Sequence, residues 1–178
     1  MAEAIPPIIS VIDVQMSVMI RTVERNDLPA LEMDGLFVKF RNLFRRAYRE
    51  QSNGRRLLLM ADSNGVAVGR LFILFVSSDH AIADGHNRAY LYSFYILSAF
   101  RGHGIGTHMV NYAEGILRER GFRYVTIAVA KDNAGALRLY ERLGYTRVRE
   151  DPGKWSYTDH LGKTHRVHEP CWILEKIL

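Results

Sequence analysis

The sequence contains 178 residues, of which 48% are hydrophobic and 24% charged, and its formal net charge is +5. This length allows one sizeable hydrophobic core but is short for two, and the composition is that of a globular protein. No apolar run reaches the roughly 18 residues that a membrane-spanning helix needs. The basic residues are scattered along the chain, which favours solvated charges and a small polyphosphate ligand over a nucleic-acid interface.

The ends of the sequence suggest one domain with an extension. Residues 18–178 are expected to form a single domain, and residues 1–17 an N-terminal extension that is in part disordered. The extension has no basic segment before an apolar core, so a secretory signal is not expected. The only cysteine, Cys171, cannot form an internal disulfide. Its apolar neighbours predict a buried side chain, and a reducing, cytoplasmic setting fits.

The first elements are a strand and two helices. Alternating residues over 18–25 predict the strand. A helix is expected to begin at Asp27, which caps it, with Pro29 in the first turn. Apolar residues at helical spacing then predict a second helix over 35–50.

Three strands follow, over 56–61, 66–77 and 89–97. The turn sequence Asp62-Ser63-Asn64-Gly65 joins the first two as a hairpin. A polar, glycine-containing loop over 78–87 precedes the third, whose aromatic residues predict a central strand.

The rest of the chain alternates helices and strands. A helix is predicted over 104–120, a strand over 124–130, and a helix that Asn133 caps and that ends near Leu143. Strands over 145–149 and 167–177 complete the chain. This order predicts an α+β fold of mixed α/β layers.

The turn Arg101-Gly102-His103-Gly104-Ile105-Gly106 opens the third helix. Glycine permits positive φ, and the first N–H groups of a helix have no intrahelical partner and favour an anion. These properties predict a phosphate site, most simply for pyrophosphate. A kinase-type P-loop needs a lysine that is missing here, and a dinucleotide fingerprint needs a third glycine at another spacing. A tight turn without a ligand is the structural alternative.

Two motifs carry a family resemblance. Arg101-x-x-Gly104-x-Gly106 resembles the coenzyme A-binding motif of the GCN5-related N-acetyltransferase (GNAT) superfamily. Asn133-x-x-Ala136-x-x-Leu139-Tyr140-x-x-x-Gly144-Tyr145 is similar to its second motif, and the resemblance covers about residues 20–149. It implies a GNAT-like fold, with a central, mostly antiparallel sheet that contains a parallel, splayed strand pair and is flanked by helices.

The resemblance also implies roles for matched positions. The backbone of the turn would bind the pyrophosphate, the preceding strand would pair with the pantetheine arm, and Tyr140 would be the general acid for the departing thiolate. A phenol can supply that proton, although Tyr140 also fits a helix stripe as a core residue. The implied cofactor-binding residues are Ile96, Leu97, Arg101, Gly102, His103, Gly104, Ile105, Gly106, Thr107, Asn133 and Ala136.

The general base is left open by the sequence. Many relatives place a glutamate on the strand before the turn, but residues 90–97 contain no carboxylate. The base could be a water held by Tyr92, Ser93 or Tyr95, or a carboxylate from elsewhere. Glu32 and Asp34 could line the acceptor side or be ordinary surface charges.

The histidines and the segment 155–168 raise two further questions, a metal site and a hairpin. His165-x-x-His168 is expected to enter a strand, where positions three apart face opposite sides, so no metal site is predicted. The tip Asp159-His160-Leu161-Gly162 predicts a hairpin that either selects the substrate or is simply exposed.

These observations predict direct transfer of an acetyl group from acetyl-coenzyme A to a primary amine, without a metal. The acceptor is left open between a small molecule and a peptide, as a protein N-terminus or lysine. A non-catalytic acyl-coenzyme A sensor or partner-binding module on the same fold is the alternative. Neither a nucleic acid nor a membrane is an expected partner, and the aromatic C-terminal strands could form a homodimer surface.

Overall fold

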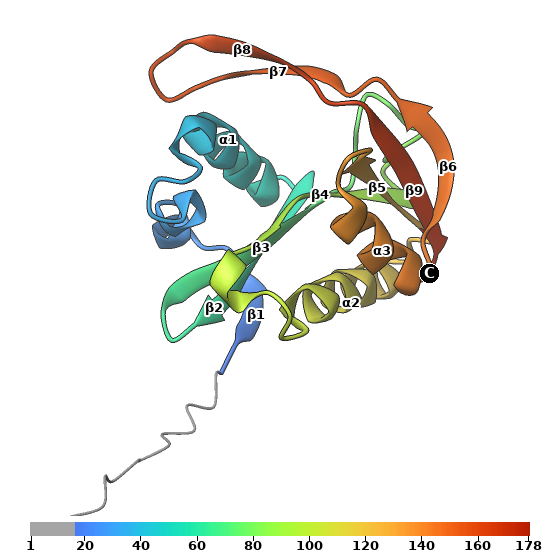
Figure 1. Cartoon of the computed structure of the whole chain (residues 1–178), viewed down its shortest axis with the longest axis horizontal. Coiled ribbons are helices and arrows are strands. Elements are labelled where there is room, and N and C mark those ends of the chain that lie inside the picture. The colour runs from blue at the N-terminus through green and yellow to red at the C-terminus, as the bar shows by residue number, and fades with distance from the viewer. Residues whose placement is uncertain (1–16) are drawn as a thin grey trace, which may run out of the picture.

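The computed structural model describes residues 17–178, and Figure 1 shows how their helices and strands are arranged. Seven strands form one sheet in the order β1-β2-β3-β4-β5-β9-β6, and β7 and β8 form a separate two-stranded sheet. The strands are Met19–Thr22 (β1), Arg56–Ser63 (β2), Val66–Leu74 (β3), Arg88–Ile96 (β4), Tyr124–Ala130 (β5), Thr146–Asp151 (β6), Lys154–Thr158 (β7), Thr164–His168 (β8) and Cys171–Ile177 (β9). The α-helices are Arg41–Ser52 (α1), Ile105–Glu119 (α2) and Ala134–Arg142 (α3).

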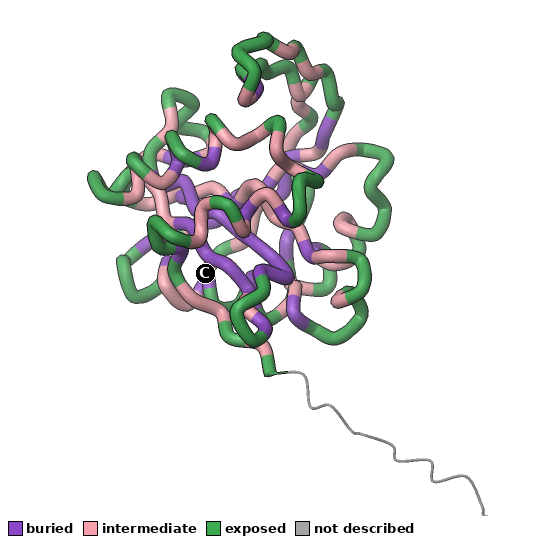
Figure 2. Tube along the Cα trace, turned by 90° about the vertical axis from the view of Figure 1, so that its left-hand side faces the viewer, coloured by how far each residue is buried: buried purple, intermediate pink, exposed green. Residues whose placement is uncertain are grey.

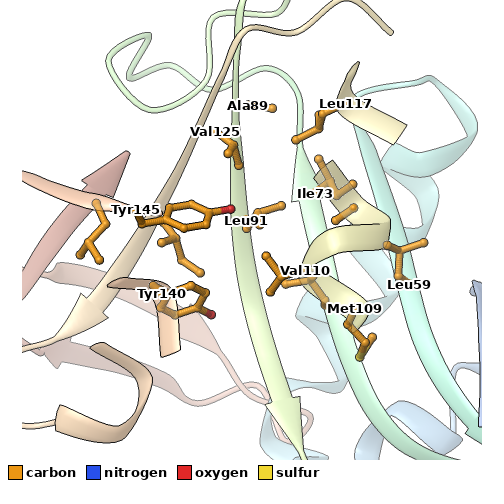
Figure 3. Packing of buried hydrophobic residues seen from close by; sticks show 14 of the residues in the cluster. Leu59, Ile73, Ala89, Leu91, Met109, Val110, Leu117, Val125, Tyr140 and Tyr145 are labelled. Atoms are coloured by element: carbon orange, nitrogen blue, oxygen red, sulfur yellow. The ribbon is translucent and has the colours of Figure 1, made fainter. Parts of the chain in front are cut away.

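Apolar residues alternate along the central strands, so each face of the large sheet carries its own core. Figure 2 shows the buried residues concentrated in the strands at the middle of the molecule. The core that faces α2 and α3 includes Leu59, Ile73, Leu91, Met109 and Leu117 (Figure 3). The core that faces α1 includes Phe44, Ala47, Leu58, Met60 and Phe72.

Strands β4 and β5 are parallel and pair only along their first halves. Arg88–Leu91 lie beside Tyr124–Ile127, whereas all of β5 pairs with β9 on its other side. The remaining pairs in the large sheet are antiparallel. The predicted α+β fold, with a mostly antiparallel sheet and one parallel pair that separates, is confirmed.

A β-bulge lies in β4 just after the point of separation. Arg70 and Phe72 of β3 are two positions apart, but their partners Tyr95 and Tyr92 are three positions apart. Ser93 lies within this longer stretch and has a φ of 54°. Because of the extra residue, Tyr92 and Tyr95 both face the α1 side of the sheet, where an unbroken strand would place them on opposite faces.

The predicted helix from Asp27 is wrong, because the chain makes short 3-10 turns before α1. Met33, Asp34 and Gly35 have φ angles of 47°, 53° and 87°. Three successive left-handed residues cannot continue a right-handed helix. The predicted helix over 35–50 is therefore shorter at its start: α1 begins at Arg41, after the last 3-10 turn, and extends to Ser52.

The predicted last strand over 167–177 is in fact two strands. Pro170 has no N–H to donate, and it lies between β8 and β9. The predicted hairpin tip is confirmed, but it closes a longer two-stranded arm of β7 and β8, which residues 154–168 form. The predicted extension lies, apart from Ser17, outside the described residues.

Candidate active site

The turn before α2 has the backbone that its glycines predict. Gly102 and Gly104 both have a φ of 79°, and Gly104 is the N-cap residue of α2. A Cβ at either position would meet no atom within 4 Å, so this turn is open to a ligand. Gly106 serves another purpose, because a Cβ there would lie 3.1 Å from the ring of Phe94. The open N–H groups of the turn fit a pyrophosphate.

The side chains of residues 101–107 lie in different surroundings. Arg101 Nε donates a hydrogen bond to the Ile96 carbonyl at 2.9 Å, which ties the turn to the end of β4. His103 is exposed, and Thr107 is half-buried. Ile105 is buried in the core under α2, so only its backbone can face a ligand.

The backbone at the end of β4 distinguishes Ile96 from Leu97. The Leu97 N–H donates to Val68 of β3, and the Leu97 carbonyl accepts from Phe100, so both groups already have partners. Backbone groups of successive strand residues point to opposite edges, which directs those of Ile96 toward the side of β5. The Ile96 carbonyl accepts from Arg101, but no backbone partner is shown for its N–H, so Ile96 is the better placed of the two for pairing with an extended ligand.

Asn133 caps α3, as predicted. Its Oδ1 accepts a hydrogen bond from the Ala136 N–H at 3.0 Å. This contact satisfies one of the first N–H groups of the helix. Asn133 is exposed, and its side-chain Nδ2 could donate a hydrogen bond to a ligand.

Tyr140 lies in the core between α3 and the end of β4. It is 2% exposed, and its ring centroid lies 6.2 Å from that of Phe94 and 5.5 Å from that of Tyr145. Figure 3 shows its hydroxyl directed toward the side of Met109 and Val110. Burial raises the pKa of this phenol, and Tyr90 raises it further. The group is therefore protonated at neutral pH, as a general acid must be.

A cavity of about 740 Å³ opens on the opposite, α1 face of the sheet. Its walls include α1, β3, β4, parts of β5 and β9, and the β7 strand of the arm. Tyr90, Tyr92 and Tyr95 line it on the side of β4, and Ala130 and Trp155 line it elsewhere. Because residues of both separated strands line it, the cavity reaches the point where β4 and β5 diverge.

The candidates for a base are distributed unevenly around this cavity. Tyr92 lines it and accepts a hydrogen bond from Arg56 Nη1 at 2.6 Å, while burial raises the pKa of Tyr92. Ser93 Oγ accepts from Arg70 Nε at 3.1 Å. Glu32 does not line the cavity, and both of its oxygens bind Arg41, at 2.6 and 2.8 Å. Asp34 is exposed and lies outside the lining as well.

Sequence reasoning missed the seven charged residues that line the cavity: Arg46, Arg56, Arg70, Asp79, Asp151, Lys154 and Glu169. Arg70 had a signal, because it is the one charged residue within the otherwise apolar strand Val66–Leu74. Asp151 lies at the end of β6, and two loops distant in sequence bring Asp79 and Glu169 to the same cavity.

The arm of β7 and β8 is fastened to α1 over the cavity. Asn42 Nδ2 donates to the Asp159 carbonyl at 2.6 Å, and the rings of Phe40 and Tyr157 lie 4.8 Å apart. Asp159 Oδ2 lies 2.7 Å from His165 Nε2. His165 and the N–H groups at the tip lower the pKa of Asp159 to about 2 against the opposing effect of burial.

The remaining histidines and the cysteine form no further site. Within residues 17–178, no group of three His, Cys, Asp or Glu side chains is arranged to hold a metal ion. Cys171 is buried as predicted, and burial together with Asp151 raises the pKa of its thiol. In the same part of the chain, no helix has both the length and the apolar character to cross a membrane.

Comparison with known proteins shows the family to which this chain belongs. The model of the acetyltransferase (GNAT) family matches residues 19–145. The chain belongs to this family. The GNAT resemblance of the two motifs is thereby confirmed, and the family is one of acetyltransferases, as predicted.

One relative of the chain is named as an N-alpha-acetyltransferase. Over 93 residues, the chain is 39% identical to N-alpha-acetyltransferase 40 of Saccharomyces cerevisiae, a match that covers 46% of this chain and 32% of the yeast protein. The matched part thus spans about a third of that curated relative's length.

Solved structures confirm the fold. The PaiA N-acetyltransferase from Thermoplasma acidophilum in complex with coenzyme A matches with a TM-score of 0.69 at 18% identity, covering 92% of this chain and 100% of that chain. Arabidopsis thaliana Naa50 in complex with the bisubstrate analogue CoA-Ac-MVNAL matches with a TM-score of 0.66 at 16% identity, covering 90% of this chain and 98% of that chain.

Proposed function

We propose that this protein transfers the acetyl group of acetyl-coenzyme A to the α-amine of a polypeptide N-terminus. The observation that carries the proposal is the placement of two open sites on opposite faces of one sheet. The turn of α2 lies on one face, the cavity of about 740 Å³ on the other, and β4 and β5 separate between them. A cavity of this size has room for the first residues of a peptide.

The donor would bind along the α2 face. The backbone from Gly102 to Thr107, with Arg101, His103, Gly104, Ile105 and Gly106, would hold the pyrophosphate. The pantetheine arm would pair with the end of β4 at Ile96, with Leu97 next to it. Asn133 and Ala136 would contact the cofactor from the start of α3. This placement brings the thioester to the point where the two strands diverge.

The reaction would be a direct attack. A neutral amine from the cavity attacks the thioester carbonyl carbon, the C–S bond breaks, and the thiolate takes a proton from Tyr140. The amine loses its proton to a water held by the tyrosines of β4, since this strand supplies no carboxylate. Tyr92 and Tyr95 face the cavity and suit that role.

The names of relatives support an N-terminal acceptor over a small amine. The yeast relative is an N-alpha-acetyltransferase, and the Arabidopsis structure contains a coenzyme A-peptide bisubstrate analogue. We further propose that residues 18–178 act as one acyltransferase domain in the cytoplasm, in line with the single cysteine. A homodimer through the C-terminal strands stays a prediction that gel filtration would test.

Thiol release from acetyl-coenzyme A tests the proposal. The acceptors are a panel of peptides with free N-termini, the same peptides with blocked N-termini and an internal lysine, and small polyamines. We expect release only with free N-termini, and mass spectrometry should place the acetyl group on the α-amine. Acetyl-coenzyme A binding without release across the whole panel would instead favour the non-catalytic sensor.

A further inference from the structure

The cavity contains a buried guanidinium that the proposed reaction does not use. Arg70 lies on β3, lines the cavity and is 4% exposed. Its Nε donates to Ser93 Oγ at 3.1 Å, and its Nη1 lies 3.4 Å from the Leu31 carbonyl and 3.5 Å from Met33 Sδ. Its planar group lies over the ring of Phe37, 3.9 Å from the centroid.

Arg70 has no carboxylate partner among residues 17–178. Of the other charged groups that line the cavity, Arg56 pairs with Glu50, and Asp79 and Asp151 both pair with Arg149. Arg46, Lys154 and Glu169 also line the cavity without an ion pair among residues 17–178, but all three are exposed to solvent, whereas Arg70 is buried. Burial lowers the pKa of Arg70 to about 10, so the group is still cationic at neutral pH. A buried cation without an anion is costly, and proteins usually compensate it.

The position of Arg70 determines which anion could reach it. It pairs with Tyr95 across the strands and contacts Ser93 of the bulge, so it borders the point where β4 and β5 diverge. An amine that attacks there would bring a nearby carboxylate of the same molecule against Arg70. Arg46, an exposed residue of α1 that also lines the cavity, adds positive charge at the outer wall.

We propose that Arg70 binds a carboxylate of the acceptor, so that the enzyme prefers peptides with Asp or Glu among their first two residues. This inference rests on the proposed function and deepens it by naming the class of N-terminus. A guanidinium can bind a carboxylate through two parallel hydrogen bonds, which gives selectivity over the isosteric amide. The same chemistry would accept the α-carboxylate of a free amino acid.

The competing explanation is that Arg70 only fastens the chain over residues 31–37 to the sheet. That role predicts a loss of stability on substitution but no change in acceptor selectivity. The two explanations therefore differ in the ratio of kcat/KM between an acidic peptide and its amide counterpart, not in the rate with a single peptide.

The test uses peptide pairs that differ only in Glu against Gln, or Asp against Asn, at position 1, 2 or 5. With wild-type protein and saturating acetyl-coenzyme A, we expect kcat/KM to favour the acid by about tenfold at position 1 or 2. The ratio should fall below about twofold at position 5, outside the reach of Arg70. Free glutamate and glycine form a further arm, and their acetylation in preference to peptides would assign the carboxylate to an amino acid.

Variants then assign the selectivity to Arg70. Arg70→Met keeps the length and the contacts with the aromatic rings but removes the charge, and should abolish the acid preference. Arg70→Lys should keep part of it, and Arg49→Met, on an exposed position of α1 outside the cavity lining, should keep all of it. A preference that survives in folded Arg70→Met overturns the proposal.

Two further measurements keep the outcome decisive. If Arg70→Met does not fold, the wild-type ratio and Arg70→Lys decide, and a wild-type ratio below about twofold at positions 1 and 2 overturns the proposal. Fluorescence anisotropy of labelled peptides with coenzyme A separates the two claims. Acid-dependent binding without turnover contradicts the proposed function alone, whereas turnover without acid dependence contradicts the role of Arg70 alone.

Discussion

Tyr140 and Tyr145 are neighbouring buried tyrosines whose hydroxyl groups have different surroundings. The Tyr145 hydroxyl donates to Glu114 Oε1 at 3.0 Å, and Lys176 Nζ lies 2.7 Å from the other oxygen of that carboxylate. Tyr145 thereby links α2 to the end of α3 and to β9. The raised pKa of Tyr140 has burial and Tyr90 as its causes, without any hydrogen-bond partner among the described residues. We infer a structural role for Tyr145 and a chemical role for Tyr140.

Tyr140→Phe is expected to lower kcat by about a hundredfold, which is the lower range for loss of a general acid. The KM for acetyl-coenzyme A should change by less than about twofold, because the ring and its packing are retained. Steady-state thiol release measures both quantities. An unchanged kcat would remove Tyr140 from the mechanism.

Tyr145→Phe is the matched control for that substitution. Loss of its buried hydrogen bond should lower the free energy of unfolding by about 1 kcal/mol. Its kcat should stay near the wild-type value, since the hydroxyl is already engaged by Glu114. A fall in kcat as large as that of Tyr140→Phe would show that both substitutions act through packing.

At the scale of elements, the turn before α2 combines a left-handed backbone that requires glycine with the proposed ligand site. Gly104→Ala should weaken coenzyme A binding by about tenfold and destabilise the protein by about 1 kcal/mol, because its φ of 79° disfavours a Cβ. Gly115→Ala, in the same helix and with no atom within 4 Å of the new Cβ, should stabilise by up to about 1 kcal/mol. Calorimetry of coenzyme A binding and thermal unfolding test both, and equal affinities would contradict the proposed pyrophosphate site.

The arm of β7 and β8 depends on α1 for its position over the cavity. Asn42→Ala removes the hydrogen bond to the Asp159 carbonyl, which should cost about 1 kcal/mol and raise the peptide KM roughly fivefold. The KM for acetyl-coenzyme A should not change, because the arm lies on the other face of the sheet. Asn111→Ala, at an exposed position of α2, is the control. A peptide KM unaffected by Asn42→Ala would mean that the arm does not border the acceptor.

The sequence predicted elements best where local rules decide them. The hairpin turn at Asn64-Gly65 and the N-cap of α3 follow from the chemistry of single residues, and both are confirmed. The left-handed backbone at Met33 and Asp34 carries no such signal, because neither residue type demands it. The 3-10 turns before α1 could therefore not be predicted.

The donor and acceptor sides of the site were also unequally predictable. The turn of α2 and the start of α3 are contiguous motifs, so the sequence names their residues. The cavity proposed for the acceptor joins α1, β4, β9 and the arm, and only the fold brings Asp79, Asp151 and Glu169 to it. The bulge at Ser93 shifts Tyr95 to the cavity face, which alternation along the strand does not predict.

In the whole molecule, the two faces of the sheet have different proposed roles. The core that contains α2 and α3 carries the proposed donor site, and the core that contains α1 forms the floor of the acceptor cavity. In the loop before β4 and at the tip of the arm, aspartates accept hydrogen bonds from backbone N–H groups of the same turn. Asp84 is one of them, accepting from the N–H groups of His86, Asn87 and Arg88 at 2.8–3.1 Å.

These carboxylates should make the protein sensitive to acid. Burial alone would raise the pKa of Asp84, but its hydrogen bonds from backbone N–H groups lower it to about 2, and the pKa of Asp159 is also about 2. In the unfolded chain an aspartate has a pKa of about 3.9. Between about pH 4 and pH 2 the unfolded chain therefore binds more protons than the folded protein. Stability from these groups is fully present above about pH 4 and is lost as the pH falls toward 2.

Thermal unfolding between pH 6 and pH 2 measures this effect. The Tm of the wild type should fall most steeply below about pH 4. Asp84→Asn should have a lower Tm than the wild type at pH 6 and a shallower fall below pH 4, because it has no proton to take up at this site. Adding Asp159→Asn should flatten the curve further, whereas Glu119→Gln, at an exposed position near the end of α2, should leave it unchanged. Parallel curves for the wild type and Asp84→Asn would mean that acid acts through other groups.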